Sequence, residues 1–168
     1  MSPFQSILVP VDGSPPSLVA LEHAIVLAED GTARVDVLHV AVGEEFNVGA
    51  STPLTTGERL ETDDALDAAI ERARVRLDGR ISRRTVSGEP LRTIIETARD
   101  GQYDLIVLGT HGRIGRLHAL LGSVAEEVVR NAPCPVLTVR EPDGGYQSFA
   151  ERRHGRPSVS EASSHHPR

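Results

Sequence analysis

Apolar residues along this chain follow two patterns, short unbroken runs and longer stretches in which they recur every three or four positions. The runs are rich in β-branched residues, which is typical of strands buried on both faces of a sheet. The longer stretches have the spacing of amphipathic helices with one buried stripe. The predicted strands are residues 7–11, 35–40, 81–87, 105–108 and 135–139, and the predicted helices run from Pro15 up to Gly31 and over residues 58–77, 89–99 and 123–130.

Strands and helices alternate throughout residues 1–140, which predicts one domain. This alternation is typical of an α/β fold with a single doubly wound, five-stranded parallel sheet and helices on both faces. Residues 105–108 form the most hydrophobic run, which predicts the most central strand, whereas the more polar residues 81–87 predict a strand near an edge.

Two segments fall outside this alternation. Residues 41–57 are rich in Gly and Thr and predict a long loop, whose length makes it a candidate lid. Residues 141–168 are rich in Gly, Ser, Pro, His and Arg without an apolar period, which predicts a disordered tail.

Composition and charge exclude several classes of function. The 168 residues carry a formal net charge of −6, which argues against nucleic acid as a partner. All 18 basic residues are Arg, so chemistry that needs a Lys, such as a Schiff base or a Walker P-loop, is excluded. The lone Cys134 allows no internal disulfide, and no apolar stretch approaches the ~20 residues of a membrane span. Without a secretory leader, we expect a cytoplasmic protein.

Two segments follow predicted strands where doubly wound sheets bind ligands, beyond the carboxyl ends of the strands. Glycine in such a segment lets the backbone approach a phosphate closely. Ser123 and Glu126 have the spacing of a capping box, and the first N–H groups of the helix that follows would attract phosphate. Arg113 and Arg116 could add positive charge. The first segment is Pro10-Val11-Asp12-Gly13-Ser14, and the second is Gly109-Thr110-His111-Gly112, nine further residues, and Gly122-Ser123.

The same residues also allow structural interpretations. The glycines could serve only a turn and a helix cap, and Asp12 could form an Asx turn that starts the first helix rather than bind ribose or a metal ion. We interpret His39 as structural, and His111 as at most a phosphate contact, because neither has an evident catalytic partner in the sequence. Packing is the favoured role of Cys134. The arginines near the second helix and third strand are interpreted as a solvated face: Arg72, Arg74, Arg76, Arg83 and Arg84.

Taken together, these segments resemble the universal stress protein family over residues 4–140. The resemblance rests on four stretches, which are residues 7–14, residues 104–109, residues 132–140, and the motif G-x2-G-x9-G-S/T at Gly109, Gly112, Gly122 and Ser123. It implies an adenine nucleotide alpha hydrolase-like fold with strand order 3-2-1-4-5. The complete motif implies the subgroup that binds ATP, with Mg²⁺ or Mn²⁺ bridging the phosphates and no assigned metal ligands.

The resemblance also implies roles for individual residues. The four motif residues would hold the phosphates and ribose, with a backbone contact from Val124 and with Arg113 nearby. Pro10, Val11 and Asp12 would lie against adenine and ribose, and Val40 would meet the adenine. Members of the family are usually dimers paired through the last strand, here Val136 to Arg140.

The function implied is that of an ATP-binding regulatory protein in the stress response, acting on an unidentified partner protein. No catalytic residue is assigned, because the sequence supplies no evident general base and any hydrolysis should be slow. The alternatives are a slow ATPase or a protein that phosphorylates itself, for example at Ser123, and an interaction module that uses no nucleotide or holds AMP or a cyclic nucleotide.

Overall fold

Five parallel strands form a single sheet in the order β3-β2-β1-β4-β5. The computed structural model describes residues 3–42, 56–110 and 122–140, and within these the side chains of residues 56–63 are left out. The strands are β1 Ser6–Val11, β2 Arg34–Ala41, β3 Ile81–Ser87, β4 Leu105–Gly109 and β5 Val136–Val139. The helices are α1 Pro15–Glu29, α2 Thr56–Arg76, α3 Pro90–Asp100 and α4 Ser123–Asn131. The predicted fold class and strand order are confirmed.

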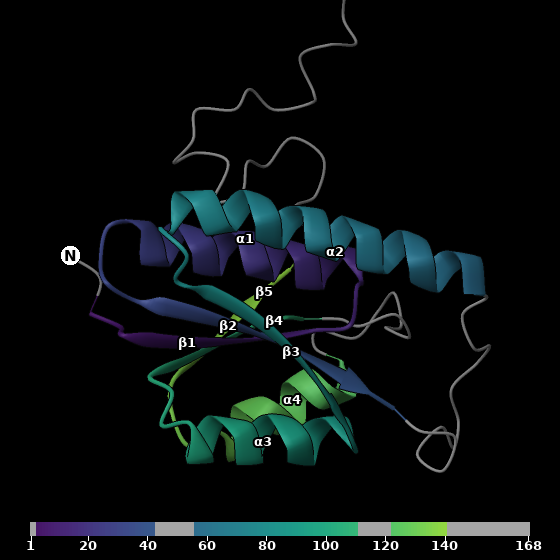
Figure 1. Ribbon diagram of the computed structural model, residues 1–168. Coiled ribbons are helices and arrows are strands. Elements are labelled where there is room, and N and C mark those ends of the chain that lie inside the picture. Colours follow the sequence, from purple (N-terminus) through teal and green to yellow (C-terminus); the bar gives the residue numbers. More distant parts are fainter. Residues whose placement is uncertain (1–2, 43–55, 111–121, 141–168) are drawn as a thin grey trace, which may run out of the picture.

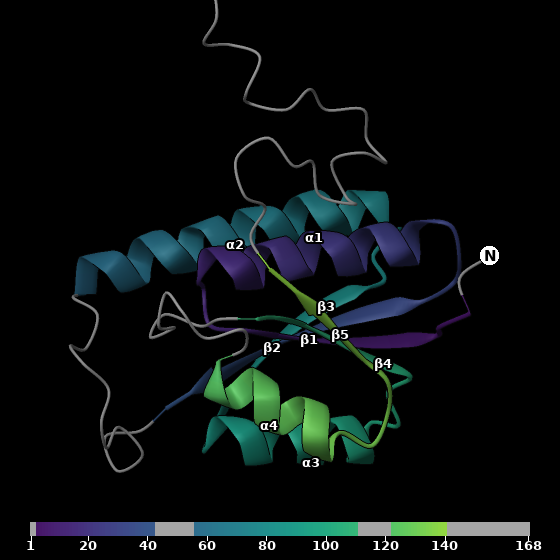
Figure 2. The same ribbon diagram turned by 180° about the vertical axis from the view of Figure 1, so that it is seen from behind.

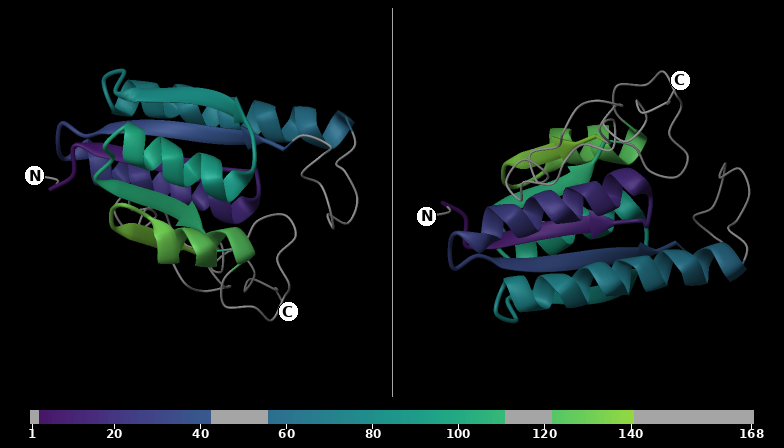
Figure 3. Two further views of the ribbon diagram at one scale, coloured as in Figure 1. Left: turned by 90° about the horizontal axis from the view of Figure 1, so that it is seen from below. Right: turned by 90° about the horizontal axis from the view of Figure 1, so that it is seen from above.

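Helices cover both faces of the sheet. Helices α1 and α2 lie side by side on one face, and α3 and α4 lie on the other (Figures 1, 2 and 3). Because side chains of a strand alternate between the faces, β1 sends Ile7, Val9 and Val11 into the core beneath α1 and α2, and Leu8 into the core beneath α3 and α4.

The helices bury the stripes that their periodicity predicts. In α1, Leu21, Ile25 and Ala28 are fully buried, and Pro15 and Pro16 occupy the first turn, where the missing N–H groups cost nothing. In α2, Leu66, Ile70 and Ala73 are buried in the same core. None of the helices in the described ranges is long and apolar enough to cross a membrane.

The central strand is β1, and the prediction that residues 105–108 would be most central is wrong. Strand β4 lies between β1 and the edge strand β5, whereas β3 forms the other edge, as predicted. The reason is that hydrophobic content reports burial on both faces. Strands β1 and β4 share that burial, so it cannot rank them within the sheet.

Two of the arginines interpreted as solvated pair with acidic residues of another element, and a third, Arg74, pairs with Glu71 within α2. Arg76 of α2 contacts Glu29 and Glu22 of α1, at 2.6 Å from Nε to Oε1 and 3.1 Å from Nη1 to Oε2. Arg83 of β3 pairs with Asp67 of α2. The partners of Arg76 and Arg83 lie far from them in the sequence, so only the packing of the helices and strands brings them together.

Residues 43–55 of the candidate lid and residues 141–168 of the predicted tail lie outside the described residues. Both interpretations therefore remain predictions.

Candidate functional site

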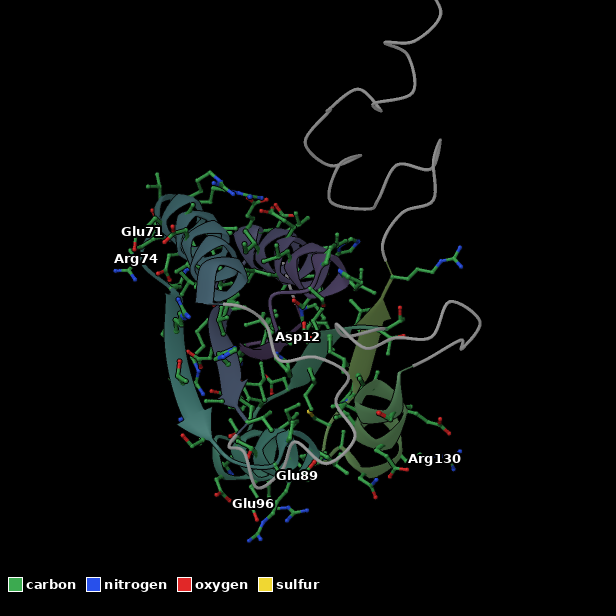
Figure 4. The ribbon with its side chains drawn as sticks, turned by 90° about the vertical axis from the view of Figure 1, so that its right-hand side faces the viewer. Asp12, Glu71, Arg74, Glu89, Glu96 and Arg130 are labelled. Atoms are coloured by element: carbon green, nitrogen blue, oxygen red, sulfur yellow. The ribbon has the colours of Figure 1, made fainter. Side chains whose placement is uncertain are left out.

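The carboxyl ends of all five strands meet at one edge of the sheet, because the strands are parallel. The described helices α1 to α4 all begin on this side of the sheet, since each follows a strand. Figure 4 views the molecule from this side and shows Asp12 between the layer of α1 and α2 and the layer of α3 and α4. The edge thus gathers the segments that the sequence singles out.

The strand order reverses between β1 and β4, which is where ligands bind in doubly wound sheets. The chain leaves β1 for α1 on one face of the sheet, whereas the segment after β4 leads to α4 on the other (Figure 1). Pairing between the two strands covers Ile7–Leu105 and Leu8–Ile106, although the strands continue to Val11 and Gly109. Both predicted binding segments therefore flank the switch point.

Asp12 forms the Asx turn that the sequence allowed as an alternative. Its Oδ1 accepts hydrogen bonds from the Ser14 N–H at 3.0 Å and the Ser14 hydroxyl at 2.5 Å. Between them, Gly13 has a φ of 77°, in the left-handed region that favours glycine. The turn sets the start of α1 and holds the Asp12 carboxylate at the sheet edge. A structural role for Asp12 is thus present, and a ligand role stays a prediction.

The end of β4 is tied directly to the start of α4. The Gly122 N–H donates to the Thr110 carbonyl at 2.6 Å, and the Thr110 N–H donates to Val139 of β5 at 2.8 Å. These bonds bring the first and third glycines of the motif, Gly109 and Gly122, to one place. No sequence signal singled out Thr110, because its contribution is made by backbone groups.

The predicted capping box is wrong by one residue. Gly122 is the N-cap of α4, with an extended backbone and no side-chain cap, and Ser123 is already the first helical residue. In a capping box the serine is the N-cap residue, and its side chain accepts a hydrogen bond from the N–H three residues later. Ser123 does not occupy that position. The Glu126 carboxylate instead accepts from Arg130 at 2.8 Å, one turn later in the helix.

In the first turns of α1 and α3, the backbone N–H groups are either absent or already bonded within the chain. In α1, Pro15 and Pro16 carry no N–H, and the next two N–H groups donate to the Ser14 carbonyl at 3.0 and 3.1 Å. In α3, the Glu89 carboxylate accepts from the N–H groups of Leu91 and Arg92 at 3.0 and 2.7 Å. Neither helix start offers its N–H groups to a ligand.

The first turn of α4 is different. Its first intrahelical bond joins the Glu126 N–H to the Gly122 carbonyl at 2.9 Å. The N–H groups of Ser123, Val124 and Ala125 precede this bond and have no acceptor among the described residues. These groups carry the partial positive charge of the helix start, which favours an anion such as a phosphate.

The residues predicted to face adenine divide between the two sides of the sheet. Val11 is 4% exposed and its side chain lies in the core beneath α1 and α2, so it can offer a ligand only backbone atoms. Val40 packs on the opposite side, against the core beneath α3 and α4. Pro10 is buried and, by alternation, faces the same side as Val40.

His39 and Cys134 have the structural roles expected of them. The Nδ1 of His39 lies 3.2 Å from the Val11 carbonyl and bonds the neighbouring strand end. Cys134 is half-buried against the core beneath α3 and α4. Burial and the nearby Asp104 raise the pKa of the thiol, so it is not activated as a nucleophile.

The middle of the glycine motif lies outside the described residues. This applies to His111, Gly112, Arg113 and Arg116, whose predicted contacts are therefore untested. Within the described ranges, no group of three or more His, Cys, Asp or Glu side chains could hold a metal ion.

Comparisons with known proteins agree on one family. Residues 3–140 match the universal stress protein family. Universal stress protein MJ0531 of Methanocaldococcus jannaschii is 35% identical over 143 residues, which cover 83% of this chain and 84% of that protein. The structure of universal stress protein UspA from Lactobacillus plantarum has a TM-score of 0.62 at 26% identity, covering 81% of this chain and 97% of that one.

Nucleotide complexes are found among the similar structures, and one example shares 26% identity with this chain. It is a universal stress protein in complex with cAMP, with a TM-score of 0.55 at 26% identity, and the match covers 81% of this chain and 96% of that one. The ligand belongs to that protein, and its chemistry is that of an adenine nucleotide.

Proposed function

The chain belongs to the universal stress protein family, and on that premise we propose that it is a regulatory protein that binds an adenine nucleotide, with ATP as the expected ligand. The observation that carries the proposal is the start of α4. Of the helices that begin at the candidate edge, α1 and α3 are closed by Pro15, Pro16 and Glu89, whereas the first N–H groups of α4 have no acceptor among the described residues and can meet an anion.

These features support one orientation of the nucleotide. The phosphates would lie at Gly122, Ser123 and Val124, where backbone N–H groups and the helix dipole favour negative charge. The base would lie on the side of the sheet that Pro10 and Val40 face, against the partly buried Val40. The Asp12 turn lies at this edge between the two layers of helices (Figure 4) and would meet the ribose.

A divalent ion fits this arrangement only as a partner of the phosphates. Mg²⁺ in nucleotide sites is commonly held by one or two carboxylates together with phosphate oxygens and water. In the described residues of the two binding segments, the carboxylate is that of Asp12. A single carboxylate fits an ion that is held mainly by phosphate oxygens and water better than an ion held wholly by protein ligands. The ion would neutralise phosphate charge, and the chain would hold the nucleotide through the α4 N–H groups.

Isothermal titration of ATP against the wild type and the double variant Gly122→Ala, Ser123→Ala tests the site. Gly122 has φ −71° and ψ 158°, a conformation that Ala adopts without strain, so the variant should fold normally. We expect one-to-one binding by the wild type and a loss of at least about tenfold in the variant, or about 1.4 kcal/mol. Asn131→Ala, at the other end of α4, is the matched control. Equal ATP affinity of the wild type and the double variant would refute the proposed site.

The identity of the nucleotide is a separate question, because the related structure holds cAMP rather than ATP. Mass spectrometry of the nucleotide that copurifies with the chain distinguishes ATP from AMP and cyclic AMP. A cyclic nucleotide would keep the adenine site and change the proposed ligand.

We also propose a homodimer paired through β5, over Val136 to Arg140. This strand is an edge of the sheet, and Leu137 on it is 37% exposed. An unpaired strand edge with an exposed apolar side chain is a template for pairing with a second copy. Light scattering should give a dimer for the wild type and a monomer for Leu137→Arg, and a monomeric wild type would exclude the pairing.

A further inference from the structure

Gly109, the first glycine of the motif, lies against the backbone of α1. A Cβ built on Gly109 would stand 2.8 Å from the carbonyl carbon of Pro16, 2.9 Å from its Cβ and 2.9 Å from the nitrogen of Ser17. Two of these three atoms are backbone, so no side-chain rotation relieves the contact. Any larger residue at position 109 must push the first turn of α1 away from β4.

The backbone of Gly109 itself does not demand glycine. Among the described glycines, the left-handed region is occupied by Gly13 and Gly79, and Gly109 is not among them. It pairs with Val139 as an ordinary strand residue. The need for glycine at this position therefore comes from the close approach of α1.

Hydrogen bonds connect the first turn of α1 to Asp12. The N–H and hydroxyl of Ser17 both donate to the Ser14 carbonyl, at 3.0 and 2.8 Å. The N–H and hydroxyl of Ser14 both donate to the Asp12 carboxylate. Ser14 and Ser17 are 3% and 4% exposed, so these bonds are shielded from water. A displacement of Ser17 is thus passed on to Asp12.

We infer that Gly109 is a positioning residue for the Asp12 turn and acts on the ribose and base end of the nucleotide, not on its phosphates. This inference rests on the proposed nucleotide site and assigns different tasks to the motif glycines. Gly109 lets α1 dock on β4 and so places Asp12, whereas Gly122 and Ser123 form the helix start that faces the phosphates.

Adenosine, which has the base and ribose but no phosphate, separates the two tasks. If Gly109 acts through Asp12, Gly109→Ala weakens adenosine and ATP by the same factor, about tenfold. Ser123→Ala should weaken ATP and leave adenosine unchanged. A Gly109→Ala variant that loses ATP affinity but binds adenosine like the wild type would overturn the inference.

Gly101→Ala is the matched steric control. A Cβ at Gly101 would meet the Tyr103 ring and the Thr97 carbonyl at the opposite edge of the sheet. It should lower stability in the same way as Gly109→Ala, with unchanged affinity for both ligands in the folded protein.

A second variant keeps the test decisive if Gly109→Ala does not fold. Ser17→Ala removes one bond to the Ser14 carbonyl without adding an atom, and we expect a smaller, equal loss for adenosine and ATP, roughly threefold. An unchanged adenosine affinity would contradict the inference.

If the wild type binds neither ligand, the proposed function fails. In that case, NMR signals of the Gly13 and Ser14 amides decide the inference, because they must shift in Ser17→Ala or Gly109→Ala and stay unchanged in Gly101→Ala.

Discussion

The Tyr103 hydroxyl donates a hydrogen bond to Oδ2 of Asp36, with 2.8 Å between the two oxygens, at the edge of the sheet opposite the candidate site. Tyr103 is 8% exposed, and Asp36 also accepts from Ser82 and pairs with Arg34. The Arg34 guanidinium lies over the Tyr103 ring, 5.5 Å from its centre. These side chains join β2, β3 and the segment that leads into β4, so the bond bears on the stability of the sheet.

This bond predicts a pH dependence at alkaline pH. Burial, and then the hydrogen bond and charge of Asp36, raise the pKa of Tyr103 from its ordinary value of 10.0 to about 12. Folding therefore favours the protonated phenol, and its stabilisation is complete below pH 10 and is lost as the pH rises toward 12. Tyr103→Phe should cost about 1.5 kcal/mol at neutral pH. The difference in unfolding free energy between wild type and variant, measured by urea denaturation, should shrink between pH 10 and 12.

The control is Tyr146→Phe, which removes the only other tyrosine of the chain. Tyr146→Phe should not change how the unfolding free energy depends on pH between pH 10 and 12. Absorbance of the remaining phenolate in Tyr146→Phe should titrate near pH 12, and an ordinary titration near pH 10 in the folded protein would contradict the prediction.

A second pH dependence is expected on the acid side, at Asp104. Its Oδ2 accepts from the N–H groups of Gln5 and Ser6, both at 2.8 Å, and these bonds lower the pKa of the carboxyl. The stabilisation is present above the ordinary pKa of Asp, near 4, and is lost as the pH falls through the lowered value. Because Asp104 is exposed, we expect Asp104→Asn to cost only about 1 kcal/mol at pH 7.

Urea unfolding at pH 7 and pH 2 measures this effect. Asp104→Asn should be less stable than wild type at pH 7, and this difference should be smaller at pH 2. Asp100→Asn removes an exposed carboxylate four residues earlier and is the control, with little effect at either pH. A loss for Asp104→Asn that persists undiminished at pH 2 would show that its charge is not responsible.

The ion pairs of Arg76 should stabilise the packing of α2 on α1. Arg76 is partly buried and bonds carboxylates of two different turns of α1, whereas Arg74 is more exposed and pairs with Glu71 within α2. We expect Arg76→Ala to cost about 1–2 kcal/mol in thermal or urea unfolding, and Arg74→Ala less than about 0.5 kcal/mol. Equal effects of the two variants would mean that the contacts between the helices contribute nothing measurable.

The backbone conformation at position 13 should require glycine. At φ 77°, Gly13→Ala places a Cβ in a strained conformation and should cost about 1–2 kcal/mol of stability. Gly122→Ala, at φ −71°, should leave stability within about 0.5 kcal/mol of wild type. Differential scanning calorimetry of the two variants checks this contrast, and an unchanged Gly13→Ala would show that the turn adapts to the substitution.

Much of the fold followed from the sequence, because local patterns report local physics. The spacing of Leu21, Ile25 and Ala28 predicts the buried stripe of α1, and Pro15 with Pro16 predicts where the helix begins. The segment Asp12-Gly13-Ser14 predicts either an Asx turn or a ligand contact, and the turn is present. The two candidate binding segments were expected at one edge of the sheet because the carboxyl ends of parallel strands share an edge.

Other features were beyond local reasoning. A capping box at Ser123 is compatible with the sequence, but the bond from Gly122 to Thr110 shifts the cap by one residue. Hydrophobicity could not rank β1 and β4, because both are covered on two faces. Arg76 resembles other exposed arginines until α1 is packed beside it.

The sequence by itself determined the order of strands and helices, the buried stripes and the position of the glycines, since each depends on side-chain pattern and backbone preference along a short stretch. Only the tertiary structure decided how the start of α4 is joined to the end of β4 and why Gly109 must be glycine. The first depends on the bond from the Gly122 N–H to the Thr110 carbonyl, and the second on the backbone of Pro16 and Ser17, distant in sequence, filling the space beside β4. Such contacts arise when elements pack, and no local pattern encodes them.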